Sequence, residues 1–327
     1  RILRLNFCEK LAKRKMLQSH CYNNVCTPFQ KVLCLHLPVM KDEVIRFLDP
    51  KPGEDFIDCT VGLGGHALAV LERNKPDGKV LGVDYDPQIL EELKRKVHGT
   101  EFEKRLVLVC DNFANLEAIA EKHGFMGVSG VLFDLGLSSW HLEASGRGFS
   151  FWRNEPLDMR YNPQSNALTA EAILNTWSLK DLERILRVYG EERFARRIAK
   201  QIVDSRPLKS TIDLVIAVER ATPPWYHRRR IHFATKTFQA LRIALNSELE
   251  NLEKALPQAL NVLRGGGKLA VIAFHSLEDR IVKNFMRAKA KEGILKVLTK
   301  KPIKPSEKEV RENPRARSAR LRVAVKI

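Results

Sequence analysis

Short apolar runs that alternate with segments of helical periodicity are the feature that most constrains the fold of this chain. The segment 89–97 is one such helical interval, with apolar residues three and four positions apart. The alternation predicts successive βαβ units and therefore a mostly parallel, Rossmann-like sheet of the α/β class. The runs that we interpret as its first strands are 55–59, 79–84, 106–110 and 130–134.

A helical interval interrupts this pattern. Between about 140 and 235 no comparable strand run occurs, and amphipathic stretches take its place. We interpret 140–235 as an inserted all-helical domain, and 36–139 together with 236–327 as the two parts of the sheet domain. The predicted helices of the insertion are 169–175, 179–188, 192–205 and 212–221.

The sheet is expected to resume after the insertion. A single long helix over 234–263 leads to three successive glycines and a strand at 268–274. A helix over 279–291 then precedes two candidate strands, 295–298 and 321–327. We predict that this last pair closes the sheet with an antiparallel element.

The charge balance points to a polyanionic partner, because 56 Lys and Arg against 39 Asp and Glu give a formal net charge of +17. An aid to solubility or import is the alternative explanation.

No apolar run approaches the roughly 20 residues that cross a bilayer, so no membrane association is expected. The six cysteines form no CxxC pair, and we predict neither a disulfide framework nor a metal site.

Residues 1–35 differ in composition from the rest of the chain. They carry several Lys and Arg residues but a single acid, Glu9, among scattered Leu, Phe and Cys residues. A basic, acid-poor and weakly amphipathic segment is typical of organellar transit sequences. A disordered RNA-binding arm is the alternative.

A glycine-rich turn follows the first predicted strand, at Gly62, Gly64 and Gly65. Glycines suit a tight turn and allow a cofactor to approach the backbone without a Cβ in the way. The spacing of Gly62, Gly64 and Ala67 also fits a dinucleotide fingerprint, with Asp84 in the place of the ribose ligand. NAD is therefore an alternative cofactor at this point.

Acidic residues close to strand ends favour a different cofactor. Asp84 is expected to accept the ribose hydroxyls, Asp111 with Phe113 to meet the adenine, and Asp134 to lie beside the reactive end of the cofactor. With Asp58, four successive strands end in an acid. Carboxylates attract the sulfonium and ammonium of S-adenosylmethionine and repel the pyrophosphate of NAD. The sequence thus predicts S-adenosylmethionine.

Nine motifs, the first of which contains the glycine-rich turn, occur in a fixed order from residue 36 to the end of the chain. They are Asp58–His66, Asp134–Ser139, Arg147–Phe151, Pro156–Arg160, Tyr189–Arg193, Thr237–Arg242, Asn246–Leu249, Phe274–Arg280 and Glu312–Ser318. In this order they resemble the bacterial family of small-subunit rRNA cytosine-N4 methyltransferases, known as RsmH or MraW. So many ordered motifs are very specific.

The resemblance implies a class I S-adenosylmethionine-dependent methyltransferase fold with an inserted helical domain that recognises RNA. It also implies N4-methylation of a cytosine in small-subunit rRNA, in support of ribosome assembly and translation. The basic segment 1–35, which bacterial members lack, makes the chain most similar to the mitochondrial member. We therefore expect a mitochondrial matrix location, mitochondrial small-subunit rRNA or the assembling subunit as substrate, and an assembly factor as a further partner.

The resemblance also implies the site residues. The family's cofactor contacts correspond to Gly64, Gly65, His66, Asp84, Phe113 and Asp134. At one further contact the family has Gln after Ser-Ser-Pro, whereas this chain has His141 after Ser139-Trp140. The role of His141 as a cofactor contact is thus an expectation at a position that departs from the family pattern.

Methyl transfer to an exocyclic amine is a direct displacement, so catalysis consists mainly of alignment and of accepting the amine's hydrogen bonds and proton. Asp134 is the first candidate acceptor, with Ser138 and Ser139 as helpers. His275 is a further catalytic candidate, although a helix-capping role is the alternative. Candidates for stacking on an extruded base, with core packing as the alternative, are Trp140, Phe149, Phe151 and Trp152.

Clustered cations are expected to contact RNA phosphates. These are Arg193, Arg196, Arg197, Lys200, Arg228, Arg229, Arg230, Arg315 and Arg317. Two other functions stay open: a methyltransferase for another nucleic acid or for protein, and a ribosome-assembly factor that binds rRNA and keeps a vestigial cofactor pocket.

Overall fold

Within residues 37–327, seven strands form a single sheet in the order β3-β2-β1-β4-β5-β7-β6. This computed structural model describes residues 37–327, so the predicted transit-like segment 1–35 lies outside the described residues. The strands are β1 (Phe56–Asp58), β2 (Val80–Asp84), β3 (Leu106–Cys110), β4 (Val128–Asp134), β5 (Leu263–Ala273), β6 (Leu295–Val297) and β7 (Arg320–Lys326).

Strands β1 to β5 are parallel, and β7 is antiparallel to both β5 and β6. The predicted parallel sheet with an antiparallel ending is therefore confirmed. The strand order reverses between β1 and β4, which are adjacent in the sheet but far apart in the sequence. In sheets of this kind, the carboxyl ends of the strands at such a reversal form a binding crevice.

Helices cover both faces of the sheet because its strands are apolar on both sides. Along β1, Phe56 packs into one layer and Ile57 into the other. One layer contains α6 (Leu116–His123), α14 (Glu248–Val262) and α15 (Ser276–Lys291). The other contains α3 (Lys41–Leu48), α4 (Gly65–Arg73) and α5 (Pro87–Val97).

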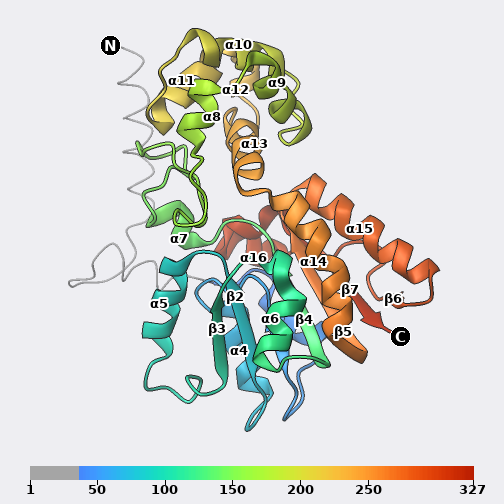
Figure 1. The fold of residues 1–327 in the computed structure, drawn as a ribbon. Helices are drawn as coiled ribbons and strands as arrows, with labels where there is room; N and C mark the ends of the chain where they lie inside the picture. Colours follow the sequence, from blue (N-terminus) through green and yellow to red (C-terminus); the bar gives the residue numbers. More distant parts are fainter. Residues whose placement is uncertain (1–36) are drawn as a thin grey trace.

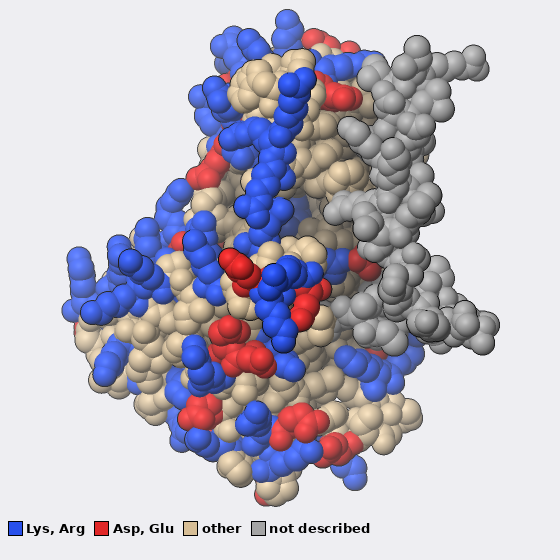
Figure 2. Space-filling model, turned by 180° about the vertical axis from the view of Figure 1, so that it is seen from behind, with Lys and Arg blue, Asp and Glu red and all other residues tan. Residues whose placement is uncertain are grey.

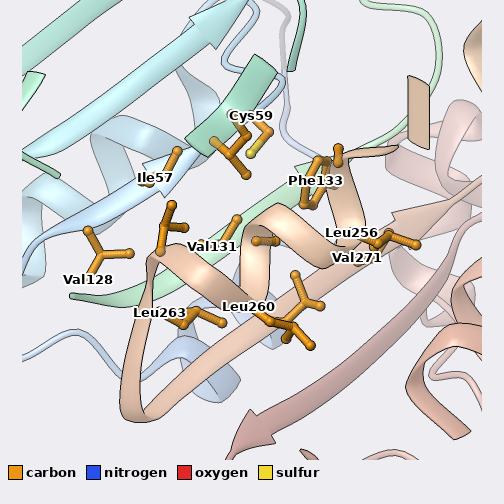
Figure 3. Packing of buried hydrophobic residues seen from close by; sticks show 14 of the residues in the cluster. Ile57, Cys59, Val128, Val131, Phe133, Leu256, Leu260, Leu263 and Val271 are labelled. Carbon is orange, nitrogen blue, oxygen red and sulfur yellow. The ribbon is translucent and has the colours of Figure 1, made fainter. Parts of the chain in front are cut away.

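Helix α14 shows how one layer is held to the sheet. Figure 3 shows Leu256 and Leu260 of α14 beside Val131, Phe133 and Val271 of the strands, and all five side chains are buried. Full burial of one such apolar side chain contributes about 1.5–3 kcal/mol. The layer is thus stabilised mainly by apolar contacts.

The helical insertion stands at the carboxyl end of the strands and has a hydrophobic core of its own (Figure 1). In α9 the apolar residues Leu182, Ile185 and Leu186 are buried, and Ser178 caps the first turn. The helices are α7 (Ser139–Glu143), α8 (Ala170–Thr176), α9 (Leu179–Val188), α10 (Ala195–Asp204), α11 (Thr211–Ala221) and α12 (Pro224–His227).

The single helix predicted over 234–263 is wrong, because the chain forms α13 (Thr235–Asn246) and then α14. Between them Ser247 adopts a left-handed conformation with φ of 50°. The leucine spacing continues across the break, and no glycine or proline marks it. Tertiary contacts stabilise the bend: the Asn246 side-chain amide donates to the carbonyl of Met159, 2.9 Å away in the insertion.

The break also moves the point where the chain returns to the sheet. Phe238, Leu241 and Leu245 of α13 pack into the core of the insertion. The transition therefore lies at Ser247, later than the predicted boundary at 236. Strand β5 likewise begins at Leu263, before the predicted start at 268. Within residues 37–327, no helix has the length and apolar character needed to span a bilayer.

Candidate active site

A cavity opens at the carboxyl ends of β1, β2 and β4, where the strand order reverses. Its floor is the turn after β1, and Asp84 and Phe113 line one end. Asp134 lies on its wall, and Glu248 lines the part nearer the insertion. The C-terminal segment around the 3-10 helix η2 (Pro314–Ser318) contributes Arg315 to the lining.

Backbone donors hold the Asp84 carboxylate in place. The N–H of Gly62 donates to Oδ2 and the N–H of Asp86 donates to Oδ1, each at 3.0 Å. Burial raises the pKa of Asp84, and these two N–H groups oppose that rise. Each oxygen keeps a further lone pair, so the predicted ribose acceptor is rigid and still able to bind hydroxyl groups.

The three glycines of the turn have different reasons to be glycine. Gly62 lines the cavity, and an added Cβ would meet only the Thr60 carbonyl, 3.8 Å away. Gly65 also lines the cavity, but its Cβ would lie 2.9 Å from Pro38 Cβ. Gly64 is not among the lining residues: its φ is 81°, and a Cβ would lie 2.6 Å from Leu93 Cδ1.

Gly64 was predicted to be glycine because the cofactor approaches its backbone. The structure gives a different physical reason for this glycine. Gly64 permits the left-handed backbone that starts α4, and it makes room for Leu93. Gly62, whose Cβ would meet the least protein, was not singled out as a contact. The fingerprint shows that glycines are present, but Gly62 and Gly64 both have a left-handed φ, of 51° and 81°, so only their neighbours show which one faces a ligand.

Two of the four strand-end acids do not reach the cavity. Asp58 is 3% exposed and accepts the N–H of Thr60 through Oδ1. Asp111 accepts the N–H of Asn112 at 2.6 Å, and Asn112 rather than Asp111 lines the cavity beside Phe113. The expected set of four facing acids thus reduces to Asp84 and Asp134.

Asp134 and His66 form the polar centre of the cavity wall. The Asp134 backbone N–H donates to Thr60 Oγ1 at 2.7 Å, and its Oδ2 lies 3.4 Å from His66 Nε2. Its other oxygen, Oδ1, is buried with no hydrogen-bond partner in the described part of the chain. Burial alone would lower the pKa of His66, but the carboxylates of Asp134 and Asp58 outweigh it and raise that pKa.

The turn after β4 brings Ser138, Ser139 and His141 to the cavity, as the sequence predicted. Ser138 caps α7 and lies 3.0 Å from His141 Nδ1 through its Oγ. His141 Nε2 lies 3.2 Å from the buried Asp86, the residue that also pairs with Arg147. His141 thus connects the insertion to the segment after Asp84.

Ser139 accepts a hydrogen bond from Arg315, whose guanidinium also pairs with Glu143. Arg315 was predicted to contact RNA phosphates, and it lies at the cavity instead of within the basic clusters of the insertion. Asn313, from the same segment, donates to the Leu37 carbonyl. These contacts place the C-terminal segment over the cavity.

A network that the sequence analysis did not assign lines the cavity on the insertion side. Arg242 donates to both oxygens of Glu248, at 2.7 and 3.0 Å, and Tyr161 Oη donates to the same carboxylate at 3.1 Å. The Tyr161 N–H donates to Asn246 Oδ1 at 3.0 Å. Arg242, Asn246 and Glu248 belong to two of the recognised motifs, and Tyr161 directly follows a third, so the motifs were visible but their meeting point was not.

His275, a predicted catalytic residue, is the N-cap of α15 and is not among the lining residues. Its Nδ1 accepts the N–H of Glu278, and the Glu278 carboxylate accepts the N–H of His275. His275, Glu278 and Glu248 each bring one ligand-type atom within 4.8 Å of the others, as a metal site would require.

The hydrogen bonds in this group do not fit a metal. Because Nδ1 accepts a backbone N–H, the neutral His275 ring carries its proton on Nε2 and has no lone pair there for an ion. Arg242 also occupies both oxygens of Glu248. The observed role of His275 is helix capping, and its catalytic role stays a prediction.

A family model, described as the MraW methylase family, matches residues 33–327. The chain belongs to the MraW methylase family. The ribosomal RNA small subunit methyltransferase H of Thermotoga neapolitana is 49% identical over 292 residues, covering 88% of this chain and 95% of that protein. The protein of the same name from Dehalococcoides mccartyi (strain BAV1) is 45% identical over 307 residues, covering 89% of this chain and 86% of that protein.

Among solved structures, an S-adenosylmethionine-dependent O-methyltransferase from Thermotoga maritima aligns over 93% of this chain and 72% of its own, with 10% identity and a TM-score of 0.41. Membership of the MraW methylase family confirms the class I methyltransferase fold and S-adenosylmethionine as the cofactor. The cavity fits this cofactor: Asp84 offers a ribose acceptor, and Asp134 Oδ1, which has no partner in the part of the chain that the structure describes, suits a cationic neighbour.

The four aromatic residues that the sequence offered for stacking on an extruded base do not line the cavity in the described part of this MraW methylase. Trp140 and Phe149 are buried, which agrees with the alternative of core packing. The Phe151 ring stacks on His232, with ring centroids 4.5 Å apart, and Trp152 lies against the same His232.

The predicted RNA contacts fall into two places. Arg193, Arg196, Arg197 and Lys200 lie on or just before α10, and Arg228, Arg229 and Arg230 follow α12. Arg315 and Arg317 lie in η2 beside the cavity, on the sheet domain. The structure thus brings the first two groups onto the helical insertion and separates them from the third.

Proposed function

We propose that the chain transfers the methyl group of S-adenosylmethionine to the N4 amine of a cytosine in small-subunit rRNA, as a mitochondrial matrix enzyme that supports ribosome assembly and translation. The names of the MraW relatives, small-subunit rRNA methyltransferases, support the substrate class. The observation that carries the chemistry is the Asp134 carboxylate, which lines the cavity and has one oxygen without a partner among residues 37–327. An amine that donates to this oxygen gains a hydrogen bond that strengthens as the nitrogen becomes positive.

The cofactor, when bound, supplies an electrophilic methyl carbon on a sulfonium. Asp134 then has two tasks: it orients the N4 amine through a hydrogen bond, and it receives, directly or through water, the proton that the nitrogen loses after the N–C bond forms. The electron pair of the breaking C–S bond stays on sulfur. His66, 3.4 Å from Asp134 Oδ2, stabilises that carboxylate as an anion when its ring is protonated.

The cations of the insertion support an extended RNA partner, because they are exposed and repeat along α10 and the segment after α12. Ser138 and Ser139 line the same cavity as Asp134, although Ser139 already accepts from Arg315. An RNA that displaces Arg315 from Ser139 would free this hydroxyl toward the substrate.

The activity is tested with labelled S-adenosylmethionine and four acceptors: small-subunit rRNA, the assembling small subunit, duplex DNA and bulk protein. We expect label in the RNA, and digestion to nucleosides should release it as N4-methylcytidine. Label confined to DNA or protein contradicts the substrate. Cofactor binding without transfer to any acceptor favours the alternative of an assembly factor with a vestigial pocket.

The mitochondrial location rests on the basic, acid-poor composition of residues 1–35 and is tested separately. Residues 1–35 fused to a fluorescent protein should direct it to mitochondria. A fusion in which the seven Lys and Arg residues of 1–35 are replaced by Gln should stay outside. Cytosolic fluorescence of the first fusion contradicts the location without affecting the proposed chemistry.

A further inference from the structure

The short helix α12 exposes a tryptophan among arginines. Trp225 is 50% exposed, although a tryptophan is among the costliest side chains to leave in water. Two prolines precede it, and Arg228, Arg229 and Arg230 follow the helix. We call the group formed by Trp225 and its neighbours the arginine–aromatic surface; its members are Arg193, Phe194, Arg197, Trp225, Tyr226 and Arg229.

Neighbouring rings hold Trp225 in a fixed orientation. Phe194 lies 5.9 Å from it, and Tyr226 lies 5.8 Å from it at 90°, measured between ring centroids. Tyr226 is itself buried, and its Oη donates to Glu192 at 2.6 Å. The guanidinium of Arg193 lies over both Trp225 and Phe194, at 5.3 and 5.2 Å from the ring centroids. Trp225 is therefore ordered while half of its surface stays exposed.

The cations around this tryptophan are not neutralised. Arg193, Arg196, Arg197, Lys200 and Arg228 to Arg230 are all exposed, and no ion pair joins any of them to an acid within residues 37–327. Glu192, which directly precedes Arg193 in the sequence, is buried and accepts a hydrogen bond from the Tyr226 hydroxyl instead of pairing with these cations. Figure 2 shows Lys and Arg side chains gathered over the helical domain.

An exposed aromatic ring with unpaired cations around it matches the chemistry of single-stranded RNA. Phosphates bind the guanidinium groups, and an unpaired base presents a flat face that can stack on tryptophan. A base within a duplex hides that face. Trp225 does not line the cavity, and α12 lies on the helical domain away from the sheet (Figure 1), so the stacked base differs from the one methylated.

We propose that the arginine–aromatic surface binds an unpaired nucleotide that flanks the methylation target, with its base stacked on Trp225. This inference rests on the proposed function, which makes RNA the substrate. It adds a second contact point, on the insertion, that selects single-stranded RNA and positions it relative to the cavity.

The test compares binding of a mixed-sequence RNA of about 12 nucleotides, within the usual length of a single-strand site, to wild type and variants by fluorescence anisotropy. Trp225→Ala should weaken binding about 5- to 150-fold, the range of one lost stack, and Trp225→Phe should restore most of it. Ile231→Ala, which removes a 51% exposed apolar side chain without a ring, is the matched control and should leave affinity unchanged. Duplex RNA should bind all four proteins alike.

A second readout separates this inference from the proposed function. With the assembling small subunit as substrate, Trp225→Ala should raise KM and leave kcat unchanged, because the contact is made equally before and during methyl transfer. If wild type labels RNA but Trp225→Ala matches it in both affinity and KM, the stacking inference is wrong and the surface is left for a protein partner. If wild type labels no RNA, the proposed function itself fails.

Discussion

The cavity and the arginine–aromatic surface are both charged, but they hold their charges in opposite ways. In the cavity, two backbone N–H groups fix Asp84, and Arg242 and Tyr161 fix Glu248. On the surface, the cations around Trp225 are exposed and unpaired among the described residues. A rigid charge can orient a small ligand, because it needs no reorganisation when the ligand arrives.

An unpaired surface charge serves a different purpose. It gains little from neighbours in water, so it is available to a polyanion, whose condensed counterions it releases. The difference teaches that charge in the cavity belongs to the stability of the fold and the alignment of reactants, whereas charge on the insertion belongs to binding. Substitutions in the two regions should therefore fail in different measurements.

The largest effect is expected from Arg242→Met, which leaves the Glu248 carboxylate buried without its cation. Both side chains are nearly buried, at 12% and 11% exposure. Removing one partner of such a pair costs about 3–5 kcal/mol of the free energy of unfolding. Urea unfolding measures it. The control is Arg187→Met, which breaks a pair with Glu183 in which the arginine is 67% exposed; that loss should stay within about 1 kcal/mol. Equal losses would contradict the distinction between the two regions.

Asp134→Asn is expected to lower single-turnover methylation by about two orders of magnitude or more, the usual scale of such contributions. The amide keeps the shape of the side chain and the contact with the neighbouring elements, but it loses the anion beside the amine. Affinity for RNA should barely change, because Asp134 lies in the cavity and not on the insertion. A variant that turns over at the wild-type rate, saturated with cofactor and RNA, would show that Asp134 only binds and would turn the search to Ser138 and His66.

Asp58 gives a pH-dependent test of the buried side of the site. Burial raises the pKa of Asp58 from 3.8 to about 7. At a pH between 3.8 and about 7, the Asp58 carboxyl holds a proton in the folded protein but not in the unfolded chain. Its contribution to the free energy of unfolding is therefore full below pH 3.8, declines as the pH rises, and is lost once the pH has passed about 7.

Asp58→Asn should remove this loss, because an amide keeps the acceptor for the Thr60 N–H and does not ionise. From pH 4 to pH 7.5, the unfolding free energy of wild type should fall relative to the variant by about 3–4 kcal/mol. Thermal or urea unfolding across that range measures it. Parallel curves for the two proteins would mean that the carboxyl group titrates as in the unfolded chain.

The smallest effects are expected from single cations of the insertion. Arg196→Ala and Lys200→Ala should each reduce the salt dependence of RNA binding, lowering the slope of log affinity against log salt by about one. Their stability should change by less than about 0.5 kcal/mol, because both residues are exposed. A loss of stability with an unchanged salt slope would show that these two cations stabilise the fold, as the cavity charges do, and would contradict the distinction between the two regions.

Local patterns in the sequence were sufficient for the architecture. Apolar runs with intervening helical periodicity predicted five parallel strands and the antiparallel ending, because burial on both faces demands such runs wherever the strand lies in the sheet. Ser138 was also predicted at the cavity, since residues that follow a strand lie at its carboxyl end, and the family resemblance implied His141 there. The ordered motifs identified the family.

Tertiary structure alone decided which of these residues face the ligand. Asp58 and Asp134 both end strands, yet one is buried in the core and the other lines the cavity, because β4 runs further than β1: Asp58 pairs with Leu132, so Asp134 lies two residues past the end of β1. Ser247 breaks a helix whose leucine spacing is unbroken, because Asn246 gains a partner in Met159. Tyr161 and Glu248, 87 positions apart, meet only after the insertion folds back. Periodicity reports what a residue's neighbours in the chain require, and it carries no information about a partner that only the packed chain brings near.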